Sequence, residues 1–157
     1  MNIKLIAIGK TDNKNLQSMM EEYQKRLSFY VKFDLEVIPD IKNVKNLSES
    51  QQKEKEGELI LAKIMPTDQL ILLDENGKAF SSMAFSEELQ KKMNSGIKTL
   101  VFVIGGPYGF SDQVYAKANG KISLSQMTFS HQMVRLFFIE QVYRGFTILK
   151  NEPYHHQ

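Results

Sequence analysis

The amino-acid sequence predicts an α/β fold in which helices cover both faces of a mostly parallel sheet. Along its 157 residues, short apolar runs alternate with amphipathic segments, which is the pattern of strands and helices in such folds. Two apolar runs, Ile71–Leu73 and Leu100–Ile104, contain no polar residue, as is typical of parallel strands buried on both faces. The chain length suits one domain with a substantial core, so we treat residues 1–157 as a single domain.

Five segments have the composition of strands, being short and rich in Ile, Leu, Val and Phe. The first stands near the N-terminus, where the absence of a small-residue cleavage site argues against a signal peptide. The expected strands are Ile3–Ile8, Phe33–Ile38, Gln69–Leu73, Thr99–Ile104 and Lys121–Leu124. The pair Asn76-Gly77 is a turn signal, and it predicts a small loop after the third strand.

Helical periodicity fills the segments between these strands. A one-sided apolar stripe predicts the first helix; its members are Leu16, Met19, Met20, Tyr23 and Leu27. Ser48 and Gln51 form a capping-box pattern, which predicts a second helix that runs to about Met65 and stops at Pro66.

Two further helices precede the last one. Phe85 and Leu89 mark a third helix, which Gly96 is expected to end. A short fourth helix is expected after the fourth strand, with Ser111 or Asp112 as its N-cap.

The last helix, predicted from His131 to Lys150, is apolar around nearly its whole circumference. Its apolar residues are Met133, Val134, Leu136, Phe137, Phe138, Ile139, Val142, Tyr143, Phe146, Ile148 and Leu149. Such a helix must be buried on all sides, and the sheet covers only one side. We therefore predict a homodimer with this helix at the interface.

Composition and charge exclude several classes of protein. The 42% hydrophobic and 24% charged residues are ordinary for a globular protein. The chain has no cysteine, which excludes disulfides and thiolate catalysis, and we expect no metal site. No stretch is long enough to span a membrane, so we expect a cytoplasmic protein. The net charge of +2 does not by itself indicate nucleic-acid binding. The lysine-rich segment 41–55 is either a solvated loop or a phosphate-contacting patch.

A glycine-rich stretch, GGPYG at residues 105–109, follows the buried strand Thr99–Ile104; we call it the glycine loop. In a parallel sheet, ligands bind at the carboxyl ends of the strands, and Gly105, Gly106 and Gly109 allow a ligand to approach the backbone. The loop lacks the lysine of a P-loop and the spacing of a dinucleotide-binding loop. It predicts either a ligand site that is not a phosphate cradle or a tight strand–helix turn without a ligand.

A second loop, SQMTFS at residues 125–130, follows the last expected strand. It combines hydroxyl groups with Met127 and Phe129, which together suit a flat heterocycle with a polar edge. Ser130 is also a fair N-cap for the last helix, a structural role that requires no ligand.

Three segments of the chain resemble one family of enzymes. They are VFVIGGPYG at residues 101–109, ISLSQMTFSHQMVRLFFIEQVYRGFTI at residues 122–148, and NEPYHH at residues 151–156. With IKLIAIGK at the start, the resemblance covers nearly the whole chain. The sequence resembles the ribosomal RNA large subunit methyltransferase H family, which belongs to the SPOUT class.

The resemblance implies properties that periodicity cannot show. It implies a C-terminal trefoil knot, although threaded chains are rare, and a homodimer. It implies S-adenosyl-L-methionine as the cofactor, bound in the knot, and N3 of a pseudouridine in the 23S rRNA of the assembled ribosome as the substrate. The alternatives are a knotted methyltransferase that acts on tRNA and a non-catalytic RNA-binding module with the same fold.

Carried over to this sequence, the resemblance assigns cofactor contacts to the end of the third strand, the glycine loop and the second loop. The residues are Leu73, Gly105, Gly106, Gly109, Ser125, Gln126, Met127, Thr128, Phe129 and Ser130. The family commonly has proline at the position of Ser130, and this departure bears on the rigidity of the second loop.

Methylation of N3 requires that the nitrogen lose its proton, so we expect a base or a group that stabilises the anionic ring. The candidates are His131 at the start of the last helix, and Tyr154 and His155 in the C-terminal tail. His131 has the alternative role of a capping or interface residue. The tail has the alternative interpretation of a frayed terminus.

Two arginines of the last helix, Arg135 and Arg144, lie nine positions apart and so point to roughly opposite sides. We favour Arg135 for a catalytic role through a cofactor or RNA contact. Glu140 and Arg144 have the i,i+4 spacing that is typical of an ion pair on a helix surface.

Overall fold

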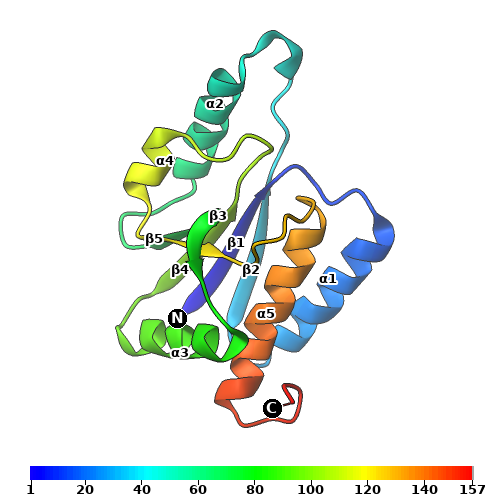
Figure 1. The fold of residues 1–157 in the computed structure, drawn as a ribbon, viewed down its shortest axis with the longest axis vertical. Helices are drawn as coiled ribbons and strands as arrows, with labels where there is room; N and C mark the ends of the chain where they lie inside the picture. The colour runs from blue at the N-terminus through cyan, green and yellow to red at the C-terminus, as the bar shows by residue number, and fades with distance from the viewer. Residues whose placement is uncertain (157) are drawn as a thin grey trace.

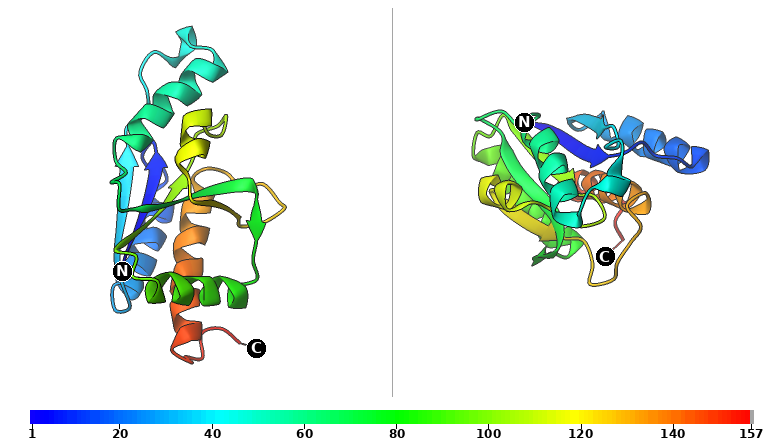
Figure 2. Two further views of the ribbon diagram at one scale, coloured as in Figure 1. Left: turned by 90° about the vertical axis from the view of Figure 1, so that its left-hand side faces the viewer. Right: turned by 90° about the horizontal axis from the view of Figure 1, so that it is seen from above.

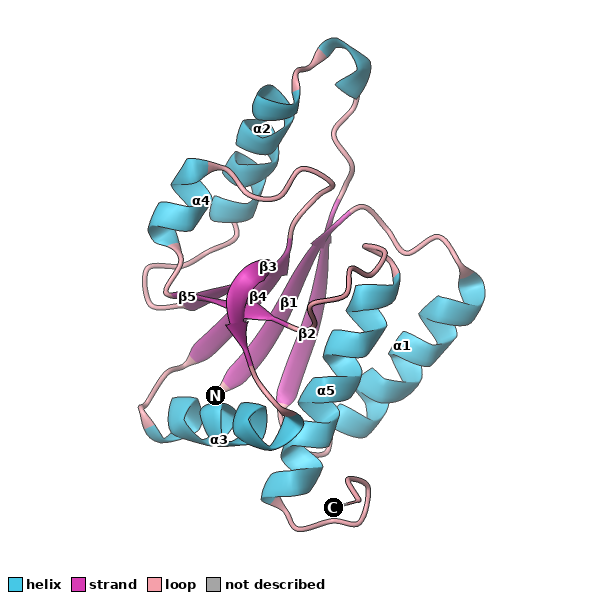
Figure 3. Cartoon of the chain, viewed as in Figure 1, coloured by secondary structure: helices cyan, strands magenta, loops and turns pink. Residues whose placement is uncertain are grey.

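The structure, a computed structural model, describes residues 1–156 and confirms an α/β fold with helices on both faces of a parallel sheet. Within these residues five strands lie in the order β2-β1-β4-β3-β5, and all neighbouring strands are parallel (Figure 1 and Figure 3). The elements are β1 (Asn2–Ile8), α1 (Lys14–Leu27), β2 (Lys32–Ile38), η1 (Val44–Asn46), α2 (Glu49–Leu61), β3 (Gln69–Ala79), α3 (Ser82–Asn94), β4 (Thr99–Ile104), α4 (Asp112–Lys117), β5 (Gly120–Ser123) and α5 (Met133–Leu149).

The sheet separates two apolar cores, because side chains alternate in direction along each strand. Leu100 and Phe102 of β4 pack with α1, α3 and α5 on one face. Val101 and Val103 pack with α2 and α4 on the other. Figure 1 shows α1 and α5 side by side, with α3 near the lower end of α5. Burial on both faces explains why the run Leu100–Ile104 contains no polar residue.

β3 is longer than the sequence predicts, and the prediction of a turn at Asn76-Gly77 is wrong. The strand continues to Ala79, and after a register shift it pairs with β5 a second time. A Cβ at Gly77 would lie 2.6 Å from backbone atoms of Ile122, so the glycine permits two strands to approach closely rather than reversing the chain. Figure 2 shows the end of β3 bending away from the other strands.

α2 begins at the predicted capping box but ends before Met65. The Ser48 hydroxyl accepts from the Gln51 amide, and the Gln51 side chain accepts from the Ser48 amide. After Leu61 the chain tightens into i→i+3 turns, and the Met65 amide donates to the Asp68 carboxylate (2.8 Å). The residue before a proline disfavours the helical conformation, so Met65 cannot continue the helix, and the helix itself already ends about one turn earlier.

The chain itself covers most of the surface of α5, which begins at Met133 rather than at His131. Phe138 and Val142 are fully buried among the sheet, α1 and α3, whereas Met133 and Phe137 remain 40% and 36% exposed. The sequence led us to assign the side of the helix away from the sheet to a second copy, but α1 and α3 of the same chain cover much of it. The remaining exposed apolar surface lies near the start of α5, and the homodimer stays a prediction.

The carboxyl ends of β4, β3 and β5 lie next to one another in the sheet, so the loops that follow these strands meet at one edge. The trefoil knot implied by the family resemblance stays a prediction. Across residues 1–156, no helix has the length and apolar character that crossing a membrane requires.

Candidate active site

A cleft of about 580 Å³ lies where the carboxyl ends of β4, β3 and β5 meet. It brings together most of the residues that were assigned to the cofactor, and one candidate base. These residues are Leu73, Gly105, Gly106, Gly109, Ser125, Met127, Thr128, Phe129 and His131. Gln126 and Ser130 were also assigned to the cofactor, but they do not line the cleft and are exposed.

The glycine loop forms a closed four-residue turn. The Gly109 amide donates to the Gly106 carbonyl (3.2 Å), with Pro107 at the second position of the turn. Gly109 has a φ of 80°, a conformation that favours glycine, and nothing lies within 4 Å of a Cβ built there. Backbone conformation therefore explains this glycine, and its Cα faces open space.

The other two glycines leave room for protein side chains behind the loop. A Cβ at Gly105 would lie 3.1 Å from the Phe110 ring, and a Cβ at Gly106 would lie 2.4 Å from a carboxylate oxygen of Glu56. From the sequence these glycines predicted either an approach by a ligand or a tight strand–helix turn, and not the room that they leave for protein side chains. Sequence reasoning also missed Glu56. Its position one turn before the apolar Ile60 places both residues on the same face of α2, and this spacing could have predicted that Glu56 is buried.

Serine hydroxyls organise the second loop. Ser123 donates to the carbonyl of Ser125, and the Ser125 hydroxyl accepts from the Met127 amide, both at 3.0 Å. The Ser130 hydroxyl accepts from the amide of Met133 (3.0 Å), so Ser130 satisfies a donor at the start of α5. The exposed side chains of the loop are consequently presented on an ordered backbone.

Asp74 and Tyr115 form a pair that joins β3 to α4 at the edge of the cleft. The Tyr115 hydroxyl donates to the Asp74 carboxylate, which also accepts from the Asn76 amide (2.8 Å). Burial and the hydrogen bond to Asp74 raise the pKa of Tyr115 to about 12, so the phenol stays protonated at neutral pH. Sequence reasoning missed Tyr115, because a lone tyrosine on a short helix carries no recognisable pattern.

Arg135, which the sequence suggested for a cofactor or RNA contact, is buried instead and exposes 1% of its surface. Its guanidinium donates to the carbonyls of Ile8 (2.8 Å) and Gly9 (2.7 Å) and to the Thr11 hydroxyl (3.1 Å). Its Nε donates to the His131 carbonyl (3.1 Å). These contacts occupy the side chain, so Arg135 ties the end of β1 to the start of α5 and does not line the cleft.

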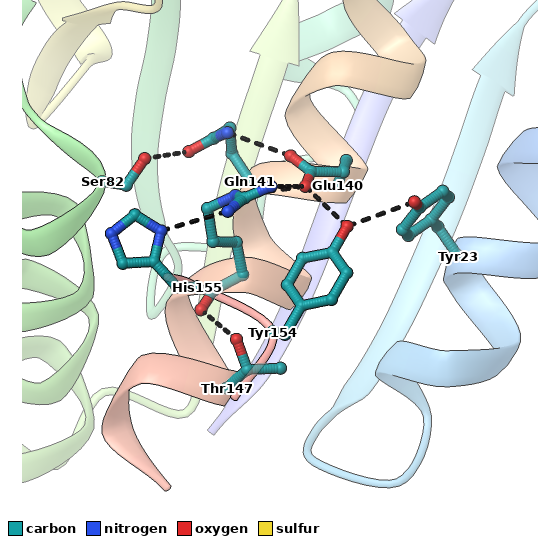
Figure 4. Close-up of polar contacts among 8 residues, drawn as sticks. Tyr23, Ser82, Glu140, Gln141, Thr147, Tyr154 and His155 are labelled. Carbon is teal, nitrogen blue, oxygen red and sulfur yellow. Dashed lines mark hydrogen bonds and ion pairs between the residues drawn. The ribbon is translucent and has the colours of Figure 1, made fainter. Parts of the chain in front are cut away.

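The C-terminal tail folds back on α5 rather than fraying (Figure 4). The Tyr154 hydroxyl donates to Glu140 (2.8 Å) and lies 3.1 Å from the hydroxyl of Tyr23 on α1. Arg144 pairs with Glu140 at 2.7 Å, and its guanidinium lies 3.0 Å from Nδ1 of His155. The ion pair predicted from the i,i+4 spacing is therefore confirmed, and it also anchors the tail.

These contacts define which atoms of the tail donate hydrogen bonds and which accept them. Because the Arg144 guanidinium only donates, Nδ1 of His155 accepts, and the neutral ring carries its proton on Nε2. That Nε2 is buried and has no partner among residues 1–156. Burial and the hydrogen bonds with Tyr23 and Glu140 raise the pKa of Tyr154. In this arrangement neither tail residue has a free basic site.

A second pocket, of about 290 Å³, adjoins the cleft and shares Ile122–Leu124 and Phe129 with it. Glu140 and Gln141 line this pocket. Gln141 donates to Glu140 (2.9 Å) and accepts from Ser82 of α3 (2.8 Å), as Figure 4 shows. The network that holds the tail thus reaches a pocket beside the cleft, although the two tail residues line neither space.

A cleft bounded by loops at the carboxyl edge of a parallel sheet is the place where α/β proteins typically bind small molecules. The chain belongs to the SPOUT methyltransferase family and is an enzyme of that class: the family model described as "Predicted SPOUT methyltransferase" matches residues 1–155.

Curated relatives match over the full length of both chains. The chain is 87% identical to the ribosomal RNA large subunit methyltransferase H of Flavobacterium psychrophilum. It is 83% identical to the protein of the same name from Flavobacterium johnsoniae, and 57% identical to that from Porphyromonas gingivalis. The family resemblance stated from the sequence motifs is therefore confirmed.

We expect Arg135→Lys to lower the free energy of unfolding by about 2–4 kcal/mol, because an ammonium group cannot replace a guanidinium that bonds four partners in a buried site. The matched control is Arg26→Lys in an exposed ion pair, for which we expect little change in the free energy of unfolding. Urea unfolding measures both. Equal stability of the two variants would contradict the structural role of Arg135.

Proposed function

We propose that this protein transfers a methyl group from S-adenosyl-L-methionine to N3 of a pseudouridine in 23S rRNA, acting on the assembled ribosome in the cytoplasm. The observation that carries the proposal is the cleft in which the glycine loop and the second loop meet, in a chain of the SPOUT methyltransferase family. The printed name of the relatives, which match the chain from end to end, supports ribosomal RNA as the substrate.

The residues of the cleft fit S-adenosyl-L-methionine. Met127 and Phe129 offer apolar contact to an adenine ring, while the hydroxyls of Ser125 and Thr128 can pair with its polar edge. The open space at Gly109 leaves the loop backbone accessible to the methionine part.

The work left to the protein is orientation and proton removal. When bound, the cofactor supplies an electrophilic methyl group on a positively charged sulfur. The two loops hold the reacting groups in line, which lowers the entropic part of the barrier. His131, the candidate base that lines the cleft, accepts the N3 proton as the bond between nitrogen and carbon forms. The bond from Arg135 to the His131 carbonyl fixes the backbone that carries this imidazole.

The active form in this proposal is a homodimer joined along α5. Met133 and Phe137 are exposed on this helix, and Phe137 packs edge-on against Phe129 of the cleft (ring centroids 4.9 Å apart). Tyr154 is hydrogen-bonded to Glu140. Glu140 stands nine positions after His131 in the sequence, and nine residues span about 13 Å along a helix. In the proposed dimer, the tail of each protomer lies beside the cleft of the other, which would bring Tyr154 and His155 to the substrate.

Calorimetry with S-adenosyl-L-methionine, followed by methyl incorporation, tests the activity. We expect binding of the cofactor and incorporation into whole ribosomes, with little into isolated large subunits, free rRNA or tRNA. Incorporation into tRNA alone would favour the tRNA-modifying alternative. Cofactor binding without incorporation into any RNA would favour a non-catalytic RNA-binding module.

We expect His131→Gln to reduce methyl transfer by about 100-fold or more while S-adenosyl-L-methionine affinity stays within about threefold, because the variant removes a proton acceptor and preserves size. His156→Gln, at an exposed tail position, is the control and is expected to keep full activity. Single-turnover methyl transfer measures both. Full activity of the His131 variant would exclude it as the base.

We expect Phe137→Glu to convert the homodimer to a monomer, because the substitution places a charge on the exposed apolar surface of α5. Phe29→Glu, at a position that is 84% exposed after α1, is the matched control and is expected to remain dimeric. Light scattering at micromolar concentration reports the mass. A wild-type protein that is monomeric in this measurement would overturn the proposed assembly.

A further inference from the structure

Glu56 of α2 is a buried carboxyl group with an unsatisfied oxygen. It exposes 4% of its surface, whereas glutamate is ordinarily exposed unless it is paired. Its Oε2 accepts one long hydrogen bond, from Gln52 (3.3 Å). Its Oε1 is buried and has no partner within residues 1–156, and none of the ion pairs in that part of the chain includes Glu56. Such a group needs an explanation, because an unpaired buried carboxylate is costly.

The carboxyl group lies directly behind the glycine loop. A Cβ at Gly106 would lie 2.4 Å from Oε1 and 2.6 Å from Oε2 of Glu56. The next residue, Gly57, packs under Ser111, the N-cap of α4, since a Cβ at Gly57 would lie 2.4 Å from the Ser111 hydroxyl oxygen. Two successive residues of α2 therefore contact both ends of the segment 106–111.

One layer of backbone separates this carboxyl group from the cleft. Gly106 lines the cleft, and Glu56 does not. A charge on Glu56 would thus act on a bound ligand across the glycine loop. The interaction would pass through protein rather than through bulk water, and Coulomb interactions are stronger in protein than in water.

The charged groups around Glu56 do not neutralise it. Burial is the main cause that raises the pKa of Glu56, and the negative charge of Asp40, after β2, raises it further. Four charged side chains of α2 and α4 line a separate cleft that does not include Glu56; they are Lys53, Glu54, Glu58 and Asp112. The other charged side chains of these two helices, Glu49, Lys55 and Lys117, are exposed. No ion pair within residues 1–156 gives an ionised Glu56 a counter-charge, and a cationic ligand in the main cleft would supply one.

We propose that Glu56 is a positioning residue behind the glycine loop whose buried carboxyl group makes the cleft favour a ligand with a positive charge over the same ligand without it. The inference rests on the proposed function, in which the cofactor arrives as a sulfonium cation and leaves as the neutral thioether S-adenosylhomocysteine. The two molecules differ only by the methyl group and its charge. Glu56 would therefore favour binding of the methyl donor and release of the product.

The proposal makes the relative affinity for the methyl donor and the product depend on pH. Protonated Glu56 carries no charge and cannot distinguish the two ligands. As the pH rises through the raised pKa, the group ionises, and the affinity for the donor increases relative to that for the product. Linkage requires that binding of the cation also release protons, and more of them than binding of the product.

Calorimetry with S-adenosyl-L-methionine and S-adenosylhomocysteine tests the inference. In the wild-type protein we expect the ratio of the two affinities to rise about threefold to tenfold between about pH 5 and about pH 8. In Glu56→Gln, which keeps the shape and removes the charge, we expect a constant ratio. Glu54→Gln, at an exposed position of the same helix, is the matched control and should keep the wild-type rise.

Other titratable groups also line the cleft: the carboxyl groups of Asp74 and Glu75, the imidazole of His131, and the phenols of Tyr108 and Tyr115. A rise in the ratio that persists in Glu56→Gln would assign the effect to these groups and overturn the inference. A flat ratio in the wild-type protein would overturn it as well. If Glu56→Gln does not fold, the protons released by the wild-type protein, measured in buffers of different ionisation enthalpy, decide the matter: equal release with the two ligands contradicts the proposal. Failure of the wild type to bind the donor at any pH would instead overturn the proposed function itself.

Discussion

The buried guanidinium of Arg135 is the interaction on which the candidate active site depends. Its hydrogen bonds to the carbonyls of Ile8 and Gly9 satisfy acceptors at the end of β1, where the strand no longer has a ladder partner for them. Its bond to the His131 carbonyl ties the start of α5 to the same point. The second loop ends where α5 begins, so this one side chain holds the loop against the edge of the sheet.

The other wall of the cleft is positioned from behind. The glycine loop is seated on Phe110 and Glu56, and both of these contacts require glycine in the loop. Side chains that never face the ligand thus define the backbone that does, and the loop is ordered before a ligand arrives. Pre-organisation of this kind suits a reaction in which the protein supplies orientation rather than a covalent nucleophile.

α5 links this site to the C-terminal tail. An aromatic cluster holds the tail: the rings of Tyr143 and Tyr154 lie edge-on with centroids 4.7 Å apart, and the Arg144 guanidinium lies 4.7 Å from the centre of the Tyr154 ring. The carboxylate of Glu140 joins this cluster to the pocket beside the cleft. The tail is therefore a folded part of the domain, and the polar groups that it carries are oriented by α5.

The sequence by itself determined the strands and most of the helices, because each depends on local patterns, and its family resemblance implied that the two loops share one site. The hydrophobic periodicity and capping residues such as Ser48 were sufficient to predict these elements. The rule that parallel strands end at one edge was sufficient to predict where their loops lie. Only the tertiary structure decided the burial of Arg135, the second pairing of β3 with β5, and the contact of Tyr154 with Glu140. Each of these joins segments that are far apart in the chain or depends on a folded-back tail. A local pattern reports which residues share a face, but the partner that covers that face is set by packing of the whole chain.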